Sequence, residues 1–172
     1  MRRLAFPSRL AGPVVLAAAL ALAACQAVPL YGSNPAQPQA AVRAELAAIA
    51  IPPVNDRLSQ IVRNELLFDV TGGGVPAAPR YELSLSANAS VSGFGVGINR
   101  VATVTVLYSL AEIATGQVAA NGRVSAAAEY EELNQAFANL SAREAAEERA
   151  ARAAADLVWQ ALALALSARL GL

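Results

Sequence analysis

The sequence contains no histidine and no lysine, and it has a single cysteine, Cys25. Without histidine the chain cannot build a serine–histidine–aspartate triad, a histidine metal site or an imidazole general base. A single cysteine excludes an internal disulfide framework and a cluster of thiolate metal ligands. Carboxylates remain, and Glu129, Glu131 and Glu132 group near the end of a predicted strand, where solvation is their ordinary role. We therefore expect a protein that is not an enzyme and that has no cofactor and no metal.

Charged residues are also scarce, at 15% of the chain, while hydrophobic residues make up 56%. This composition supports a packed core and differs from that of disordered chains. All 13 basic residues are arginines, and three of them (Arg2, Arg3 and Arg9) precede residue 25. Residues 25–172 contain the other ten arginines and all 13 acidic residues, so this part of the chain has a net charge of −3. Because a nucleic-acid-binding protein needs a net basic surface, we expect no nucleic acid among the partners.

The N-terminus has the pattern of a lipoprotein signal peptide. A basic segment, MRRLAFPSR, precedes an apolar segment, LAGPVVLAAALAL, which is long enough for a signal peptide and shorter than the roughly 20 residues that span a bilayer. Leu22-Ala23-Ala24-Cys25 follows, and it resembles the bacterial lipobox, in which small residues precede the cleavage site and a thiol receives diacylglycerol. We predict a signal peptide over residues 1–24 and lipidation of Cys25. The alternative is an ordinary secretory signal followed by a free cysteine.

Lipidation of Cys25 would hold the mature chain on a membrane through acyl chains on its sulfur and, commonly, on its new α-amino group. Each buried methylene contributes about 0.8 kcal/mol, so that two or three chains hold a protein almost permanently and one chain does not. Gln26 follows the cysteine, where an aspartate would favour the inner membrane of enteric bacteria. We therefore expect the cell outer membrane, on its periplasmic side, with residues 25–41 as a lipidated N-terminus and a proline-containing tether.

Residues 42–172 are expected to form one domain, which begins with a strand and a helix. The apolar run at 46–51 ends at Pro52-Pro53 and predicts a short strand. The next segment predicts an amphipathic helix over 55–68, capped by Asn55. Its apolar stripe consists of Leu58, Ile61, Val62 and Leu66. The Gly72-Gly73-Gly74 run lacks the lysine and hydroxyl residue of a phosphate-binding loop, so it is expected to be a connector.

Three strands follow in sequence. Residues 81–91 alternate apolar and polar side chains, which predicts a strand with one buried and one polar face. A glycine-rich loop containing Phe94 and Val96 leads to a Val/Thr-rich strand over 101–112. A third alternating strand runs over 118–130, after a turn at Thr115-Gly116. Within this strand, Gly122 is expected to mark a β-bulge.

A long alanine-rich helix is expected from Ser141 onward, where Ser141 and Glu144 have the spacing of a capping box. The element order is therefore strand–helix–strand–strand–strand–helix, or β-α-β-β-β-α. This order predicts an α+β two-layer sandwich in which two helices cover one face of a four-stranded, mixed and mostly antiparallel sheet.

Several motifs, taken in order, resemble the LPS-assembly lipoprotein family, LptE. They are Pro29-Leu30-Tyr31-Gly32 after Cys25, then Arg57-x-x-Gln60-x-x-Arg63-Asn64-Glu65-Leu66, then Leu107-Tyr108-Ser109-Leu110 with Thr115-Gly116, then Phe137-Ala138-Asn139-Leu140 with Glu147-x-Arg149-Ala150-Ala151. The resemblance covers nearly the whole mature chain. It implies two helices on a four-stranded sheet. It also implies a lipoprotein that plugs the outer-membrane β-barrel LptD, helps it to assemble, and assists lipopolysaccharide transport to the outer leaflet without enzymatic activity.

Contact with anionic lipopolysaccharide would use arginines near loops, because a guanidinium pairs bidentately with phosphate. Arg80, Arg100 and Arg123 are the candidates, with Phe94 and Val96 as apolar contacts for lipid or barrel. The alternative for each arginine is an ordinary solvated side chain. A different function also remains open, namely a lipoprotein that binds a peptidoglycan synthase or an ABC-type lipid transporter.

Overall fold

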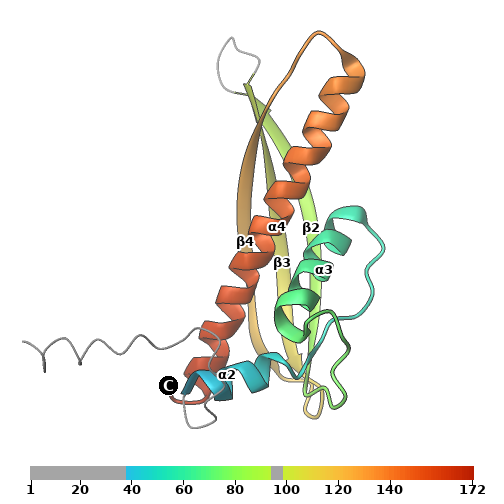
Figure 1. Ribbon diagram of the computed structural model, residues 1–172. Helices are drawn as coiled ribbons and strands as arrows, with labels where there is room; N and C mark the ends of the chain where they lie inside the picture. Colours follow the sequence, from blue (N-terminus) through green and yellow to red (C-terminus); the bar gives the residue numbers. More distant parts are fainter. Residues whose placement is uncertain (1–37, 94–98) are drawn as a thin grey trace, which may run out of the picture. The chain divides into compact units, whose positions relative to one another are not determined.

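The computed structural model describes residues 38–93 and 99–172, which form one sheet with helices on one of its faces (Figure 1). The elements are α2 (Pro38–Leu46), β1 (Ile49–Ala50), α3 (Arg57–Thr71), β2 (Tyr81–Gly93), β3 (Asn99–Glu112), β4 (Val118–Glu131) and α4 (Ala136–Arg169). The sheet order is β1-β2-β3-β4, with β1 parallel to β2 and the other neighbours antiparallel. The predicted α+β fold with a mixed, mostly antiparallel four-stranded sheet is therefore confirmed.

The three long strands show the alternation that the sequence predicts. In β2 the odd-numbered residues from Tyr81 to Ala89 face the helices, and the even-numbered ones face solvent. In β3 the fully buried residues are even-numbered, from Ala102 to Leu110. Such alternation follows from the two-residue period of a strand that has one face on a core and one in water. The sheet thus has one apolar, helix-covered face and one open face.

Small residues on α4 bring this helix close to the sheet. Its buried face begins with alanines and continues with larger side chains, which pack against β3 and β4. The buried apolar residues of α4 are Ala146, Ala150, Ala151, Ala154, Ala155, Val158, Leu162 and Leu166. α3 packs beside α4 and covers β2, with the predicted stripe at Val62 and Leu66 fully buried.

The ends of α3 are set by one side chain and one glycine. The N-cap is Asp56, whose Oδ1 accepts the Ser59 N–H at 2.8 Å, so the predicted cap at Asn55 is wrong by one residue. Burial alone would raise the pKa of Asp56, but its hydrogen bonds with the Ser59 hydroxyl and backbone lower that pKa below its ordinary value. At the other end, Gly72 has a φ of 67° and its N–H donates to Phe68 O, which closes the helix with a left-handed residue.

Helix α2 was not predicted, because its sequence resembles a tether. It begins at Pro38, inside the segment expected to be a tether, and proline is well suited to the first position of a helix because its missing N–H has no partner there. Val42 and Leu46 then pack on the core, and α2 contacts α4 and α3. As α2 occupies residues up to Leu46, the predicted strand at 46–51 is shorter than expected, only Ile49–Ala50.

The β3–β4 turn lies at Thr115-Gly116 as predicted, and Gly116 has a φ of 69°. The predicted bulge at Gly122 is wrong. The register breaks instead between Leu110 and Ala111, whose partners are Ala120 and Val118. Gly122 pairs in register with Tyr108, and a Cβ at Gly122 would lie 2.7 Å from the Tyr108 hydroxyl oxygen. The glycine therefore makes room for the tyrosine ring and does not break the ladder.

The predicted start of the last helix at Ser141 is also wrong. α4 begins at Ala136, so Ser141 lies inside the helix and no capping box forms; its N-cap residue, Gln135, makes no side-chain capping bond. Asn139 holds the preceding loop instead, because its side-chain amide accepts the Leu133 N–H and donates to the Leu133 carbonyl, both at 2.6 Å. These two hydrogen bonds fix the loop just before α4, which begins five residues before the predicted start at Ser141.

One buried serine joins α3 to the sheet. The Ala87 N–H of β2 points away from β3 and donates to the Ser59 hydroxyl oxygen at 2.8 Å. Ser59 is fully buried because it lies three residues before Val62 and seven before Leu66, on the same face of α3. A buried N–H without a partner costs about 1–3 kcal/mol, so the Ser59 hydroxyl removes this cost where α3 packs on β2.

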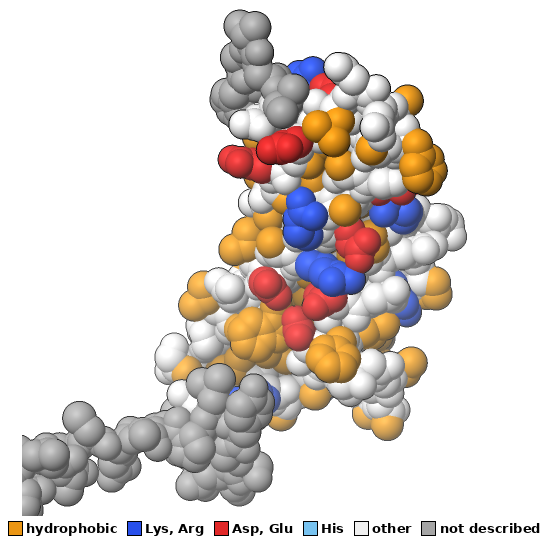
Figure 2. Space-filling model, turned by 45° about the horizontal axis from the view of Figure 1, so that its top comes forward, with side chains coloured by type: hydrophobic (Ala, Val, Ile, Leu, Met, Phe, Trp, Pro, Cys, Tyr) orange, Lys and Arg blue, Asp and Glu red, His pale blue; other side chains and the backbone are white. Residues whose placement is uncertain are grey.

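The helix-covered side carries charges of both signs. The buried Glu147 carboxylate accepts from Arg57 Nη2 at 2.9 Å and from Arg143 Nε at 2.8 Å, which links α3 to α4. The hydrogen bond with Glu147 raises the pKa of Arg143. Farther along α4, Arg152 pairs with Glu148. On the face that Figure 2 presents, acidic and basic side chains lie close to one another.

Candidate functional site

The open face of the sheet is rich in small, uncharged polar side chains. It is formed by the even-numbered residues of β2 and the odd-numbered residues of β3 and β4. Its hydroxyl and amide residues are Ser84, Ser86, Asn88, Ser90, Ser92, Asn99, Thr103, Thr105, Ser109, Asn121 and Ser125. Thr105 and Ser125 hydrogen-bond across β3 and β4 at 2.9 Å. This face can offer many neutral hydrogen-bonding groups to another surface, together with the exposed apolar side chain of Leu107.

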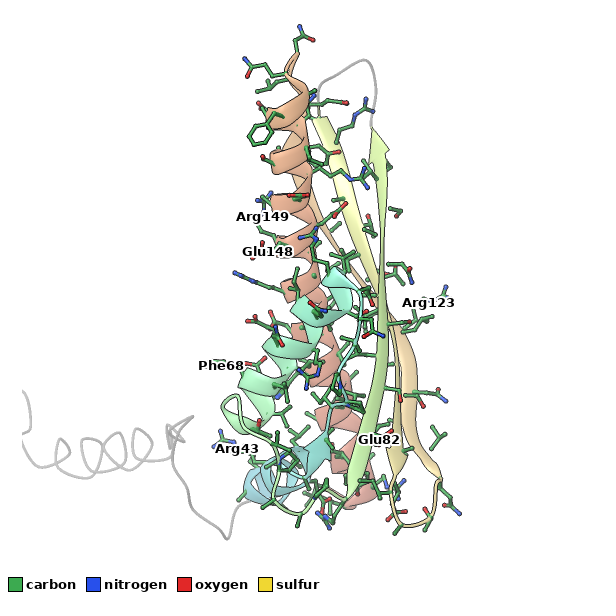
Figure 3. All side chains as sticks on the ribbon, turned by 90° about the vertical axis from the view of Figure 1, so that its right-hand side faces the viewer. Arg43, Phe68, Glu82, Arg123, Glu148 and Arg149 are labelled. Atoms are coloured by element: carbon green, nitrogen blue, oxygen red, sulfur yellow. The ribbon has the colours of Figure 1, made fainter. Side chains whose placement is uncertain are left out.

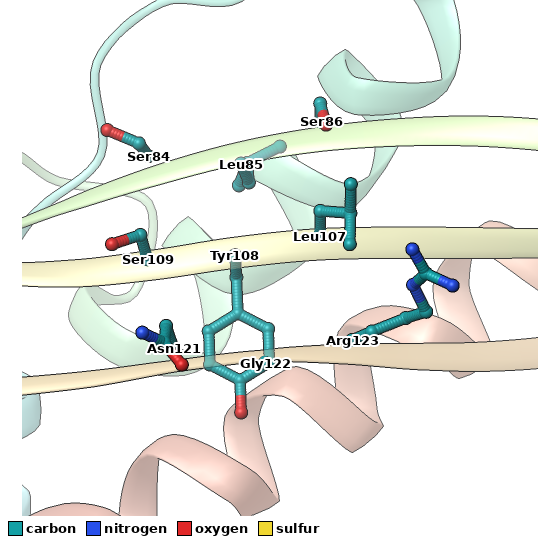
Figure 4. A pocket seen from close by; sticks show the side chains of 9 residues that line it. All are labelled: Ser84, Leu85, Ser86, Leu107, Tyr108, Ser109, Asn121, Gly122 and Arg123. Carbon is teal, nitrogen blue, oxygen red and sulfur yellow. The ribbon is translucent and has the colours of Figure 1, made fainter.

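An open depression of about 640 Å³ lies at the middle of this face (Figure 4). Two rows of paired residues border it, Ser84–Ser109–Asn121 and Ser86–Leu107–Arg123. The row between them is Leu85–Tyr108–Gly122. Tyr108 and Leu85 pack toward the core, and Gly122 has no side chain. The middle row thus contributes mainly backbone to the open face. The side chains of the two bordering rows project from the sheet on either side of it and form the walls of the depression.

Arg123 is the only charged residue that lines this depression. Its side chain projects from the sheet on the side away from the helices (Figure 3). It makes no ion pair with any of the described residues. A guanidinium in this setting retains all of its hydrogen-bond donors for an external phosphate, carboxylate or carbonyl group. Of the three predicted arginines, Arg123 is therefore the one placed for recognition.

Arg80 lies at the end of the sheet where β2 begins, and it is engaged within the protein. Its guanidinium forms an ion pair with Glu45 of α2 and lies 5.9 Å from the centre of the Tyr81 ring. The hydrogen bond with Glu45 raises the pKa of Arg80, and burial together with Glu45 raises the pKa of the Tyr81 phenol. Arg80 therefore ties α2 to the start of β2.

Arg100 lies at the opposite end of the β2–β3 hairpin, where it pairs with Gly93 across the strands. It forms an ion pair with Glu132, and its side chain covers Gly93 so closely that a Cβ there would overlap the guanidinium. The structure therefore does not bring Arg80, Arg100 and Arg123 together into one cationic site. Phe94, Val96 and Cys25 lie outside the described residues, so their predicted roles stay predictions.

The structure does not gather the three grouped carboxylates into one site. Glu132 is engaged by Arg100, while Glu129 and Glu131 stand on the open face of β4. Within residues 38–93 and 99–172, no three histidine, cysteine or acidic side chains come close enough to bind a metal ion together. None of the helices in this part of the chain combines the length and hydropathy needed to cross a bilayer.

The sequence identified the polar face of β2 and Arg123, but not the other residues of this site. Ser109, Leu107 and Asn121 line the depression because the register places them beside Ser84, Ser86 and Arg123. The alternation of 101–112 and 118–130 was a signal for their facing outward. Their position relative to β2 depends on strand register, which alternation alone does not specify.

Among the solved structures that share this fold are those of two bacterial proteins. One is a protein of Caulobacter crescentus CB15 described as a candidate lipoprotein, with a TM-score of 0.63, 23% sequence identity, and coverage of 74% of this chain and 96% of its own. The other is rare lipoprotein B of Shewanella oneidensis, with a TM-score of 0.51, 16% identity, and coverage of 67% of this chain and 91% of its own. No protein-family model and no curated protein matches the sequence. The likeness establishes a common fold.

Proposed function

We propose that this chain is an outer-membrane lipoprotein, anchored through Cys25, that plugs the LptD β-barrel and assists its assembly and lipopolysaccharide transport. The observation that carries the proposal is the open sheet face, a broad surface rich in hydroxyl and amide side chains over which no helix of the described residues lies. The interior of a large outer-membrane barrel is polar and hydrated. A surface of serine, threonine and asparagine can exchange its water for hydrogen bonds with such a lining, while the charged side chains on the same face, Arg123, Glu129 and Glu131, require polar or charged partners there.

The anchor is supported from two directions. The lipobox residues Leu22-Ala23-Ala24-Cys25 stand at the end of a signal-peptide pattern. The Caulobacter and Shewanella structures with this fold both belong to proteins described as lipoproteins, the second of them rare lipoprotein B. The ordered LptE-like motifs then favour the barrel as partner over a peptidoglycan synthase or a lipid transporter. No catalytic chemistry is needed for any of these roles, and we propose that the protein is not an enzyme.

Within this function, Arg123 is the residue proposed to contact lipopolysaccharide. It combines an unpaired guanidinium with a depression bordered by hydroxyl groups, and phosphorylated sugars present both anions and hydroxyls. The net charge of −3 without the first 24 residues means that the attraction has to be local. Arg80 and Arg100 would first have to release Glu45 and Glu132.

The barrel proposal predicts which face makes contact. A photo-activated cross-linking residue at Ser109, in the depression, should capture a protein much larger than this 17.6 kDa chain from outer membranes, and mass spectrometry should identify it as a β-barrel. The same residue at Glu148, on the helix-covered side, is the matched control and should capture far less of that barrel. Capture of a peptidoglycan synthase or transporter subunit at Ser109, or of nothing, would contradict the barrel proposal.

Replacing Arg123 by glutamate should weaken binding of purified lipopolysaccharide by about tenfold or more. A hydrogen bond to a charged group contributes about 1.5–3 kcal/mol, and 1.4 kcal/mol is a factor of ten in affinity. Arg152→Glu is the control, because it reverses a charge on the helix-covered side and leaves the depression unchanged. Titration calorimetry measures both. Equal loss in the two variants would mean that net charge, and not the depression, governs lipopolysaccharide binding.

A further inference from the structure

The outer edge of β4 is a row of unpaired backbone groups. The Ala87 N–H points away from β3, so Ala87 and its partner Val106 form a non-hydrogen-bonded pair. In such a pair both residues direct their backbone groups away from each other, and the N–H and C=O of Val106 therefore point toward Val124 of β4. The register of β3 and β4 continues unbroken from there to Asn99 and Glu131. The odd-numbered residues of β4 between Asn121 and Glu131 therefore direct their backbone N–H and C=O groups outward, along the edge.

The two edges of the sheet are protected very differently. On the β2 side, β1 pairs with Tyr81 and Glu82, and the Ser59 hydroxyl accepts the Ala87 N–H. On the β4 side, one hydrogen bond from the described residues reaches the edge, from Arg149 Nη2 to the Glu129 carbonyl oxygen at 2.9 Å. A long unprotected edge strand is a ready template for another strand. β4 has 14 residues, so the available template is long.

We propose that the β4 edge pairs antiparallel with the β4 edge of a second copy of this chain, with the two-fold axis at Ala126. In this register Arg123 lies opposite Glu129 of the other copy, and the two-fold repeats the pair. Both residues have outward-directed backbone groups, as a hydrogen-bonded pair requires, and both side chains stand on the open face. The two copies would share one continuous sheet, and the interface would be the same patch on each chain.

Charge complementarity selects this partner and this register. Neither Arg123 nor the Glu129 carboxylate has an ion-pair partner among the described residues. Opposite charges directly across antiparallel strands stabilise the pair, while like charges oppose it. An axis at Ser125 would place Arg123 opposite Ala127, and lose the charge pair. An axis at Ala127 would pair Arg123 with Glu131 but shorten the overlap, since β4 ends at Glu131.

The residues around the proposed axis are small, which lets the strands approach. Ser125, Ala126, Ala127 and Ala128 are consecutive in β4. Among the described residues, Arg149 opposes pairing, because its guanidinium donates to the Glu129 carbonyl at the edge. Arg149 is exposed and can rotate away into solvent. A second strand therefore has to replace the hydrogen bond between Arg149 and the Glu129 carbonyl with one of its own.

The charge pair is tested by reversal and rescue in the full-length lipidated chain, in detergent, by analytical ultracentrifugation over a concentration series. Wild type should form dimers. Arg123→Glu and Glu129→Arg should each weaken the dimer about tenfold or more, because each places like charges opposite one another twice. The double variant should restore dimerisation, and Arg152→Glu should have no effect. A monomeric wild type, or a double variant no better than the single ones, would overturn the proposal.

The register is tested with cysteine substitutions, since Cys25 is the only cysteine of the chain. Ala126 would face its own copy in a non-hydrogen-bonded pair, with Cα atoms about 4.5 Å apart, within the range for a disulfide. Ala126→Cys should therefore cross-link two copies on oxidation, and Ala128→Cys, which would face Val124, should not. Equal cross-linking of both, or cross-linking of Ala126→Cys to a different polypeptide, would show that self-pairing is wrong.

The proposed function uses the same guanidinium, so in this dimer lipopolysaccharide would compete with Glu129 of the second copy for Arg123, yet the outcomes of the two proposals are distinct. The double charge variant has the wrong charge at position 123 for a phosphate, yet it retains the cross-strand pair. It should therefore dimerise like wild type while binding lipopolysaccharide as weakly as Arg123→Glu does. Loss of both properties together in the double variant would count against self-pairing.

Discussion

Replacing Cys25 by alanine should transfer the protein from the membrane fraction to the soluble or precursor fraction. The alanine has no thiol to receive diacylglycerol, and the α-amino group for further acylation is not released without cleavage. Two or three acyl chains, at about 0.8 kcal/mol per buried methylene, supply the whole of the proposed anchoring energy, so the expected change in partitioning spans several orders of magnitude. Membrane fractionation and intact-mass spectrometry measure the location and the missing lipid mass.

The matched control for the anchor is Ala24→Gly, which retains a small residue before the cleavage site. This variant should carry the same lipid mass as wild type and remain with the membranes. If the Cys25→Ala chain has the same mass and partitioning as wild type, the lipobox interpretation is wrong and Cys25 is the free cysteine of an ordinary secretory signal. The sheet and its open face would then need another explanation for their placement at a membrane.

Replacing Leu162 by alanine should lower the free energy of unfolding by about 2–5 kcal/mol. The Leu162 side chain is 0% exposed, inside the cluster that joins α4 to the sheet. The cost combines the lost transfer of the removed methyl groups out of water with the cavity that rigid neighbours leave behind. Urea unfolding followed by far-ultraviolet circular dichroism measures it, provided that the slope with denaturant is unchanged.

Leu164→Ala is the control for this prediction, because it makes the same chemical change two positions later in the same helix. The Leu164 side chain is 71% exposed, so its removal should change stability by no more than about 0.5 kcal/mol. Similar losses in the two variants would contradict the orientation of α4 on the sheet. A loss at Leu164 alone would indicate that this exposed side chain is covered by another surface.

Much of the fold was predictable because each long strand lies between a core and solvent. The apolar and polar residues that alternate over 81–91 and 118–130 match the core and solvent faces of a strand, and β2 and β4 show the same alternation of buried and exposed side chains. Helix α2 was missed because its apolar contacts, Val42 and Leu46, act on residues far along the chain. The start of α4 was missed because an Asn139 side chain holds a loop in a way that a capping-box motif does not describe.

The candidate site was predictable only in part. Arginine was the right residue type to consider, but Arg80 and Arg100 are engaged by Glu45 and Glu132, which lie far from them in sequence. Arg123 remains available because no acidic side chain of the described residues lies beside it on the sheet. Its strand neighbours Gly122 and Val124 belong to the helix-covered face, and its cross-strand partner is the apolar Leu107. No local pattern distinguishes a paired arginine from an unpaired one, because the pairing is a tertiary contact.

By itself, the sequence determined the chemistry that is absent, the lipobox pattern around Cys25, and the three alternating strands, because these depend on residue types and on short-range periodicity. The tertiary structure decided which face of the sheet stays open, which arginine stands on it, and which edge remains unpaired. These features depend on the register between strands and on where α3 and α4 pack. A shift of register by one residue would change the outward face without changing any residue in the sequence.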